Sequence, residues 1–172
     1  VGEHIESLVP YAPGKPIEEV ERELGIEGCI KLASNENPLG PSPRAMEAVR
    51  EAASKLHYYP DGGAYYLKRA LSDRLGVGLD ELVIGNGSNE LLEFVVRTFM
   101  QPGQNAVTSA ATFIVYKLAT LACGHQIRES PLGPDQGYDL DAMADLVDER
   151  TRVIFLANPN NPTGTCFGAE AL

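Results

Sequence analysis

Apolar residues recur every three or four positions in the first part of the chain, which is the spacing of one face of an amphipathic helix. Three helices are expected there, at about 16–24, 43–56 and 67–75. Ser42 and Pro43 suit the start of the second helix, because serine caps helices and proline fits their first turn. Loops rich in Pro, Gly and Asn separate the three segments.

From residue 81 onward, short apolar runs alternate with helical patterns. Strands are predicted at ELVIG (81–85), NAVTSA (105–110), HQIRESPL (125–132) and TRVIFLAN (151–158). Helices are predicted at GSNELLEFVVRTFM (87–100), TFIVYKLATLA (112–122) and LDAMADLVDE (140–149). This alternation is typical of an α/β fold with a mostly parallel sheet flanked by helices. The helix at 87–100 is apolar on most sides, and TRVIFLAN has the character of a strand buried on both faces, so both are expected to be buried.

The first residues differ from the rest in composition. Residues 1–16 are rich in Pro and Gly and are expected to form an extended arm. We expect 1–45 to comprise this arm and the start of a small domain, and 46–172 to be the N-terminal part of a large α/β domain.

Charge and composition exclude several kinds of partner. The formal net charge is -10, and no basic patch interrupts it, so nucleic acid is not an expected partner. No apolar run is long enough for a membrane span, and no signal peptide is visible, so a cytoplasmic protein without a membrane partner is expected. Neither the cysteines nor the histidines show the spacing of a zinc site, and no metal is predicted.

Two junctions between a predicted strand and the following loop hold candidate binding residues. At GNGSNE (85–90), glycines and the free N–H groups of a helix start favour a phosphate site made by Gly87, Ser88 and Asn89. The alternative is a plain turn with Ser88 as the helix cap. A dinucleotide fingerprint is disfavoured, because Glu90 occupies the position of its last glycine.

The second junction is NPNNPTG (158–164), which directly follows an apolar strand. Two Asn-Pro steps and a glycine predict a tight, irregular exit from the sheet. An asparagine side chain there can donate an N–H to a ligand oxygen. The alternative is an ordinary turn rich in Asn and Pro.

Together, GNGSNE and NPNNPTG resemble the corresponding segments of the fold-type-I aminotransferases. SNENPLGPSP (34–43) and YYPDG (58–62) narrow the resemblance to the histidinol-phosphate aminotransferase family, over essentially the whole chain. The resemblance implies the fold-type-I architecture, here an incomplete large domain with an N-terminal arm. It also implies pyridoxal 5′-phosphate (PLP) as cofactor, an amino donor and a 2-oxo acid as substrates, and a homodimer.

The resemblance also implies roles for individual residues. Gly87, Ser88 and Asn89 would hold the PLP phosphate. Phe113 would stack on the pyridine ring, in place of the tyrosine that related sequences usually carry, although an ordinary core aromatic remains the alternative. Asn161 would donate a hydrogen bond to the 3′ oxygen of PLP, and its bond to the following proline is expected to be cis.

Three more residues receive roles from the resemblance. Tyr59 would reach the phosphate of the neighbouring subunit's cofactor, which implies active sites shared across a homodimer. Tyr11 and Asn35 would line the substrate pocket. The alternatives are a surface tyrosine for Tyr59 and a packing contact for Tyr11.

The family places its catalytic lysine, ring-nitrogen aspartate and carboxylate-binding arginine after the NPTG segment, so no catalytic residue is assigned within 1–172. None of the lysines follows the Ser-x-x-Lys pattern. We therefore expect this chain to be inactive alone. For the whole enzyme, the resemblance implies transamination of histidinol phosphate with 2-oxoglutarate in histidine biosynthesis. The alternatives are an aromatic-amino-acid aminotransferase, a threonine-phosphate decarboxylase, or a non-catalytic truncated protein. If later strands are absent, TRVIFLAN is expected to expose an apolar edge and to promote dimerisation or aggregation.

Overall fold

The computed structural model describes residues 1–11 and 13–172; Ala12, within the predicted arm, lies outside the described residues. The chain divides into two compact units, and each is described by itself. The first unit comprises Val1–Pro10 and Asp80–Leu172, and the second comprises Tyr11–Leu79. The predicted boundary between a small-domain segment at 1–45 and a large-domain segment at 46–172 stays a prediction.

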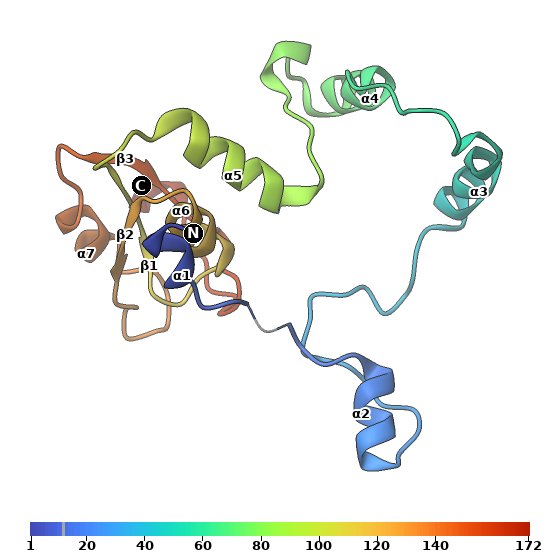
Figure 1. The fold of residues 1–172 in the computed structure, drawn as a ribbon, viewed down its shortest axis with the longest axis horizontal. Helices are drawn as coiled ribbons and strands as arrows, with labels where there is room; N and C mark the ends of the chain where they lie inside the picture. Colours follow the sequence, from blue (N-terminus) through green and yellow to red (C-terminus); the bar gives the residue numbers. More distant parts are fainter. Residues whose placement is uncertain (12) are drawn as a thin grey trace. The chain divides into compact units, whose positions relative to one another are not determined.

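A three-stranded parallel sheet forms the centre of the first unit (Figure 1). Its strands are β1 (Asn105–Ser109), β2 (Gln126–Ser130) and β3 (Thr151–Ile154), in the order β2-β1-β3. Both pairings of β1 are parallel, and every residue of this central strand is buried. The parallel sheet predicted from alternating strands and helices is therefore confirmed.

Helices cover both faces of this sheet. On one face, α5 (Gly87–Phe99) and α6 (Val115–Ala122) enclose a core cluster. The cluster's buried members are Val96, Met100, Ala106 and Phe155. α7 (Leu140–Asp145) contacts β1 and β2, and Figure 1 shows it on the side of the sheet opposite α6. The prediction of a sheet flanked by helices is thus confirmed.

The ends of these elements follow local rules. The Asp139 carboxylate accepts the N–H of Ala142 at 2.9 Å and so caps α7. Gly124, with φ of 79°, lies just past the end of α6, where a left-handed residue satisfies the last carbonyl groups. The expected arm is not extended throughout, because α1 (Glu3–Glu6) forms within it and contacts α6.

Three expectations about burial and strands are wrong. Residues 82–85 form no strand: a 3₁₀ turn, η2 (Leu79–Glu81), precedes an extended segment that pairs with no strand in the described part of the chain. α5 is not buried all round, since Phe94 and Phe99 are 43% and 62% exposed. β3 is an edge strand with Ile154 49% exposed, because β1 is its one neighbour in the sheet.

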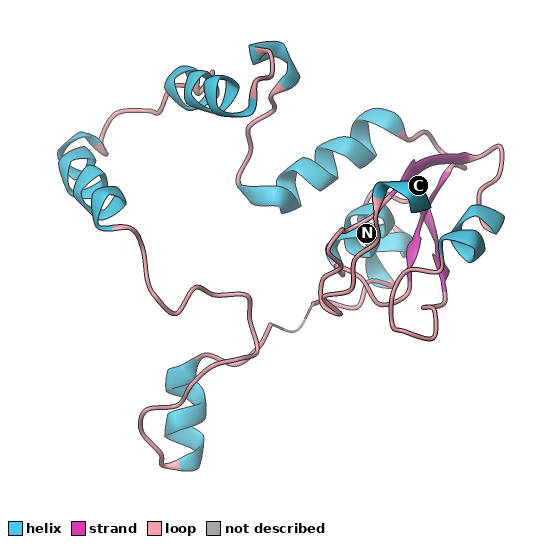
Figure 2. Cartoon of the chain, turned by 180° about the vertical axis from the view of Figure 1, so that it is seen from behind, coloured by secondary structure: helices cyan, strands magenta, loops and turns pink. Residues whose placement is uncertain are grey.

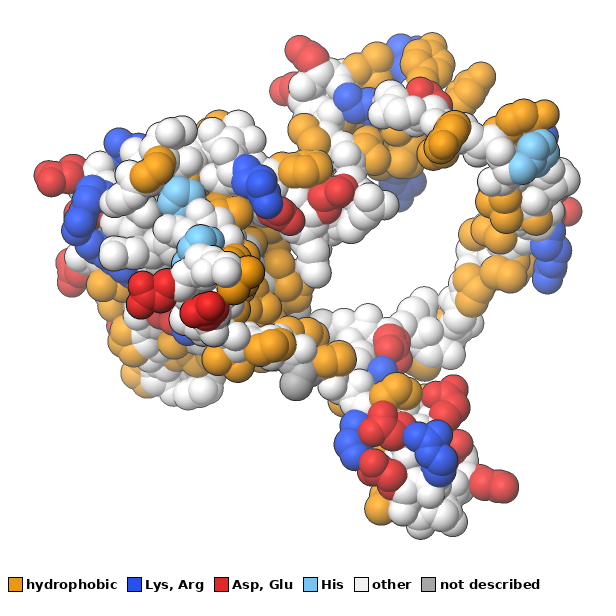
Figure 3. All heavy atoms as spheres, viewed as in Figure 1, with side chains coloured by type: hydrophobic (Ala, Val, Ile, Leu, Met, Phe, Trp, Pro, Cys, Tyr) orange, Lys and Arg blue, Asp and Glu red, His pale blue; other side chains and the backbone are white. Residues whose placement is uncertain are grey.

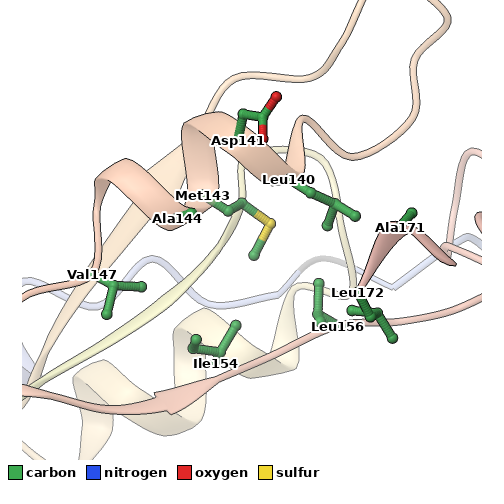
Figure 4. A pocket seen from close by; sticks show the side chains of 9 residues that line it. All are labelled: Leu140, Asp141, Met143, Ala144, Val147, Ile154, Leu156, Ala171 and Leu172. Carbon is green, nitrogen blue, oxygen red and sulfur yellow. The ribbon is translucent and has the colours of Figure 1, made fainter. Parts of the chain in front are cut away.

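An apolar cavity of about 520 Å³ lies beside this edge strand (Figure 4). Ile154 and Leu156 point into it from the β3 segment, and Met143 from α7. Leu172, directly after η3 (Ala169–Ala171), closes another side. The apolar edge expected for the TRVIFLAN strand is therefore present.

The second unit consists of short helices joined by long loops, and its described part has no strand, as Figure 2 shows. Its elements are α2 (Ile17–Leu24), α3 (Pro43–Ala52), η1 (Ala53–Lys55) and α4 (Tyr65–Leu75). These bounds lie close to the predicted ones, although the Ser42 side chain makes no capping bond to α3. No described side chain of this unit is fully buried, and many apolar ones are exposed on its surface (Figure 3). Its helices therefore form without a core of their own.

Candidate functional site

Three loops follow the carboxyl ends of the three parallel strands. Residues 110–114 connect β1 to α6, residues 131–139 connect β2 to α7, and residues 155–167 follow β3. Because parallel strands end at the same edge of a sheet, these loops gather where α/β folds bind their ligands. The predicted residues Phe113 and Asn161 lie on the first and third loops.

Asn160 joins the loop after β3 to the loop after β1. Its side chain is 3% exposed and makes three hydrogen bonds. The Thr112 hydroxyl donates to Oδ1 of Asn160 at 2.8 Å, while Nδ2 donates to the Ala111 carbonyl at 2.9 Å and to Oγ1 of Thr163 at 2.8 Å. A buried amide needs such partners, so these bonds fix the two loops against each other.

Tyr138 adds the loop after β2 to this connection. Its hydroxyl lies 2.7 Å from Oγ1 of Thr112 and accepts the Ala157 N–H at 3.0 Å. Its ring also contacts Phe167 edge-on, with 5.9 Å between the ring centroids. All three loops at the carboxyl edge are therefore linked by side-chain hydrogen bonds.

The NPNNPTG segment closes on itself. The Gly164 N–H donates to the Asn160 carbonyl, and the Asn160 N–H donates to the Thr165 carbonyl, both at 2.8 Å. At its base, the Asn158 side chain donates to the Phe167 carbonyl at 2.9 Å and accepts the Phe167 N–H at 3.2 Å. The Asn161–Pro162 peptide bond is cis, as predicted, and so is Asn158–Pro159.

Phe113 directly follows Thr112, and Asn161 directly follows Asn160, so both candidate residues stand next to a partner of the Thr112–Asn160 hydrogen bond. Both residues are half-buried. Phe113 meets Tyr116 edge-on at 5.6 Å between centroids, and Tyr116 in turn stacks on Phe155 at 4.7 Å. Burial raises the pKa of the Tyr116 hydroxyl above its usual value. The structure thus brings together the two loops that carry the predicted partner of the pyridine ring and the predicted partner of its 3′ oxygen.

The first turn of α5 contains Gly87, Ser88 and Asn89, all exposed. Gly87 has a φ of 77°, and a side chain built there would meet no atom within 4 Å. The helix begins at Gly87, so Asn86 occupies the cap position and the alternative role of Ser88 as cap is wrong. Glu90 does not point to open solvent, because its carboxylate accepts the Asn86 N–H at 2.7 Å.

Tyr11, Asn35 and Tyr59 belong to the second unit. Tyr59 is fully exposed (101%), and Tyr11 and Asn35 are exposed too. The structure does not relate them to the residues of the first unit, so their roles stay predictions.

Sequence reasoning missed three residues of this site: Thr112, Tyr138 and Asn160. Asn160 stands inside the recognised NPNNPTG segment, but the sequence offers three asparagines there and no signal that this one is buried. Tyr138 lies 26 residues from Thr112, and nothing local marks the pair. Among the described residues there is no metal-binding group of three or more His, Cys, Asp or Glu side chains. Within the same residues, no helix has the length and apolar character of a membrane span.

The profile of the family described as aminotransferase class I and II matches residues 27–172. The chain belongs to this family. It is also 56% identical over 164 residues to the histidinol-phosphate aminotransferase of Anaeromyxobacter sp. (strain Fw109-5), which covers 95% of this chain and 45% of that protein. Identity to the histidinol-phosphate aminotransferase of Moorella thermoacetica is 50% over 170 residues, which covers 99% of this chain and 44% of that protein.

Solved aminotransferase structures share the fold. The crystal structure of histidinol-phosphate aminotransferase from Sinorhizobium meliloti in complex with pyridoxal-5′-phosphate aligns with a TM-score of 0.84 at 29% identity, covering 99% of this chain and 45% of that one. A Thermus thermophilus aspartate aminotransferase aligns with a TM-score of 0.82 at 19% identity, which supports the fold alone. The predicted family and fold class are confirmed, and the chain spans less than half the length of these aminotransferases.

Proposed function

We propose that this chain is part of a PLP-dependent aminotransferase that transfers the amino group of histidinol phosphate to 2-oxoglutarate. One observation carries the proposal: the bonds of Asn160 to Ala111 and Thr112 hold the Phe113 and Asn161 loops together at the ligand-binding edge of the sheet. The similarity to histidinol-phosphate aminotransferases over 95% or more of the chain supports this choice of substrate.

The residues present fit PLP by their chemistry. Asn161 offers an amide that can donate to the ring's 3′ oxygen, and Phe113 offers an aromatic face for the ring. The exposed first turn of α5 offers N–H groups and the Ser88 hydroxyl, and a Cβ at Gly87 would point into open space. A helix start of this kind suits a phosphate, because its N–H groups and dipole both favour an anion.

PLP, when bound, supplies the electron sink that makes transamination possible. The residues of this chain would bind and orient it. Gly87, Ser88 and Asn89 would hold the phosphate, Phe113 would fix the plane of the ring, and Asn161 would polarise its 3′ oxygen.

The second unit would contribute to the substrate side. We propose that Tyr59 reaches the cofactor phosphate of a second subunit in a homodimer, and that Tyr11 and Asn35 line the substrate pocket. Tyr11, Asn35 and Tyr59 are exposed, which is compatible with contact to a ligand or a partner chain. Location in the cytoplasm also remains part of the proposal.

Steady-state kinetics of the full-length protein test the substrate. We expect the largest kcat/KM with histidinol phosphate as donor and 2-oxoglutarate as acceptor. A larger kcat/KM with phenylalanine would instead favour an aromatic-amino-acid aminotransferase, and CO₂ release from threonine phosphate would favour a decarboxylase. A full-length protein that binds no PLP would contradict the proposal and favour a non-catalytic role.

Borohydride trapping tests where the covalent cofactor link lies. In the isolated 172-residue chain with added PLP, we expect no stoichiometric adduct that survives denaturation. The candidate lysines are Lys15, Lys31, Lys55, Lys68 and Lys117. An adduct mapped to one of them at full occupancy would show that the chain carries its own catalytic lysine.

A further inference from the structure

The linked side chains at the carboxyl edge form a continuous series of hydrogen bonds with one direction. The Ala111 carbonyl can only accept, so the group of Asn160 that faces it is the NH₂, and Oδ1 must be the acceptor from Thr112. Thr112 has one hydroxyl hydrogen, and the bond to Asn160 uses it. Tyr138 must therefore donate to Thr112 at 2.7 Å, while its oxygen accepts the Ala157 N–H.

The same reasoning extends the series beyond Asn160. Nδ2 of Asn160 donates to Oγ1 of Thr163, which lies 2.8 Å from Oγ1 of Thr165. Thr165 uses its hydrogen on the Gln136 carbonyl at 3.3 Å, so Thr163 donates to Thr165. The series starts at the Ala157 N–H, in the loop after β3, and ends at the Gln136 carbonyl, in the loop after β2. It includes Thr112 of the loop after β1, so it connects all three loops.

We propose that Tyr138 is a positioning residue for the cofactor site: its hydroxyl orients Thr112, and through Thr112 it sets the position of the Asn160–Asn161 segment relative to Phe113. The inference rests on the proposed function, since Phe113 and Asn161 are the proposed ring contacts. Its physical basis is cooperative: in a half-buried chain of hydrogen bonds each donor polarises the next, and removing one member leaves its neighbours without partners.

Tyr138→Phe removes one oxygen and keeps the ring against Phe167. In the full-length protein we expect PLP affinity to fall about fivefold, as for the loss of one net hydrogen bond. The pH midpoint of the bound cofactor's absorbance change should rise, because a displaced Asn161 stabilises the anionic 3′ oxygen less. A purely structural role would leave that midpoint in place.

Three further variants make the test specific. Thr112→Val should reproduce the effects of Tyr138→Phe, whereas Thr112→Ser, which keeps the hydroxyl, should restore affinity to near that of the wild type. The double variant Tyr138→Phe with Thr112→Val should be little worse than either single variant, since both break the same series. Tyr116→Phe is the matched control: it loses the same atom in the same unit, and its hydroxyl has no hydrogen bond among the described residues.

A readout without cofactor separates this inference from the proposed function. In apo protein, hydrogen exchange at the Asn160 and Gly164 amides should be faster in Tyr138→Phe than in Tyr116→Phe, because both amides close the NPNNPTG loop. If the wild type binds PLP but Tyr138→Phe matches Tyr116→Phe in affinity, pH midpoint and exchange, the positioning role is refuted. If the wild type binds no PLP, the proposed function fails, and exchange alone decides whether Tyr138 holds the loop.

Discussion

The hydroxyl of Thr112 donates to Oδ1 of Asn160 at 2.8 Å, across 48 residues of sequence. The bond joins the loop after the central strand β1 to the loop after the edge strand β3. Phe113 and Asn161, which follow these two residues, are thereby held on neighbouring loops. The proposed cofactor site therefore depends on a half-buried contact between residues that would not themselves touch the cofactor.

Asn160→Asp tests this contact with a nearly isosteric change. A carboxylate cannot donate to the Ala111 carbonyl or to Thr163, and it would be buried, so the free energy of unfolding should fall by about 2–4 kcal/mol. Urea unfolding measures the loss. Asn37→Asp is the control: Asn37 is exposed and its Oδ1 accepts the Leu39 N–H, which a carboxylate does equally well. Equal stability of the two variants would contradict the role of Asn160.

Gly87→Ala tests the phosphate site at the start of α5. A φ of 77° disfavours a side chain, so the variant should lose about 1–2 kcal/mol of stability. PLP affinity in the full-length protein should fall as well, because the first turn must shift to relieve the strain. Gly25→Ala, at a φ of 64° and with equally open space, serves as control. Gly25→Ala should show a similar loss of stability with unchanged PLP affinity. Equal PLP affinities of Gly87→Ala and Gly25→Ala would contradict a role of Gly87 in the phosphate site.

Asp148 lies near the amino ends of the strands and is expected to make the free energy of unfolding depend on pH. Hydrogen bonds from the Asn105 side chain, the Arg150 N–H and the Arg128 guanidinium hold the pKa of this carboxyl well below its usual value. Such a group contributes fully above the unfolded pKa, about 3.9, and loses its contribution as pH falls through the lower folded pKa. Asp148→Asn should therefore be less stable than the wild type at pH 7, and the difference should shrink below about pH 4.

Urea midpoints measured from pH 7 to pH 2.5 give that difference directly. Asp145→Asn is the matched control, because Asp145 is exposed and makes no ion pair or side-chain hydrogen bond with the described residues. Its difference from the wild type should change less with pH than that of Asp148→Asn, because Asp145→Asn removes no ion pair or side-chain hydrogen bond in the described part of the chain. If the stability difference between Asp148→Asn and the wild type did not change with pH, folding would leave the pKa of the Asp148 carboxyl unchanged, which would contradict the prediction.

Ile154→Lys tests whether the apolar edge of β3 makes the isolated 172-residue chain self-associate. Half of this side chain is exposed beside an apolar cavity, and an edge strand offers unpaired backbone groups to a second chain. We expect the wild-type chain to self-associate, and Ile154→Lys to reduce association in sedimentation velocity, since a lysine at an edge opposes pairing. Val83→Lys, which changes another exposed apolar residue outside the sheet, should have a smaller effect. A wild-type chain that stays monomeric at high concentration would contradict the prediction.

The contrast between α2 and residues 82–85 shows what kind of feature the sequence predicts. α2 ends at Leu24, as predicted, and the glycine that follows has the left-handed conformation that ends many helices; spacing and capping are local properties. ELVIG has equally clear strand character, yet it remains unpaired. A strand exists only where another strand supplies hydrogen bonds, and none in the described part of the chain does so.

The sequence by itself determined the family, most of the helices and strands, and the segments NPNNPTG and GNGSNE. These follow from short-range periodicity and from residue types whose backbone preferences act locally. The tertiary structure alone decided that Asn160 is buried and that Tyr138 meets Thr112. Burial and side-chain pairing depend on neighbours distant along the chain, and the parallel sheet brings those neighbours together at one edge.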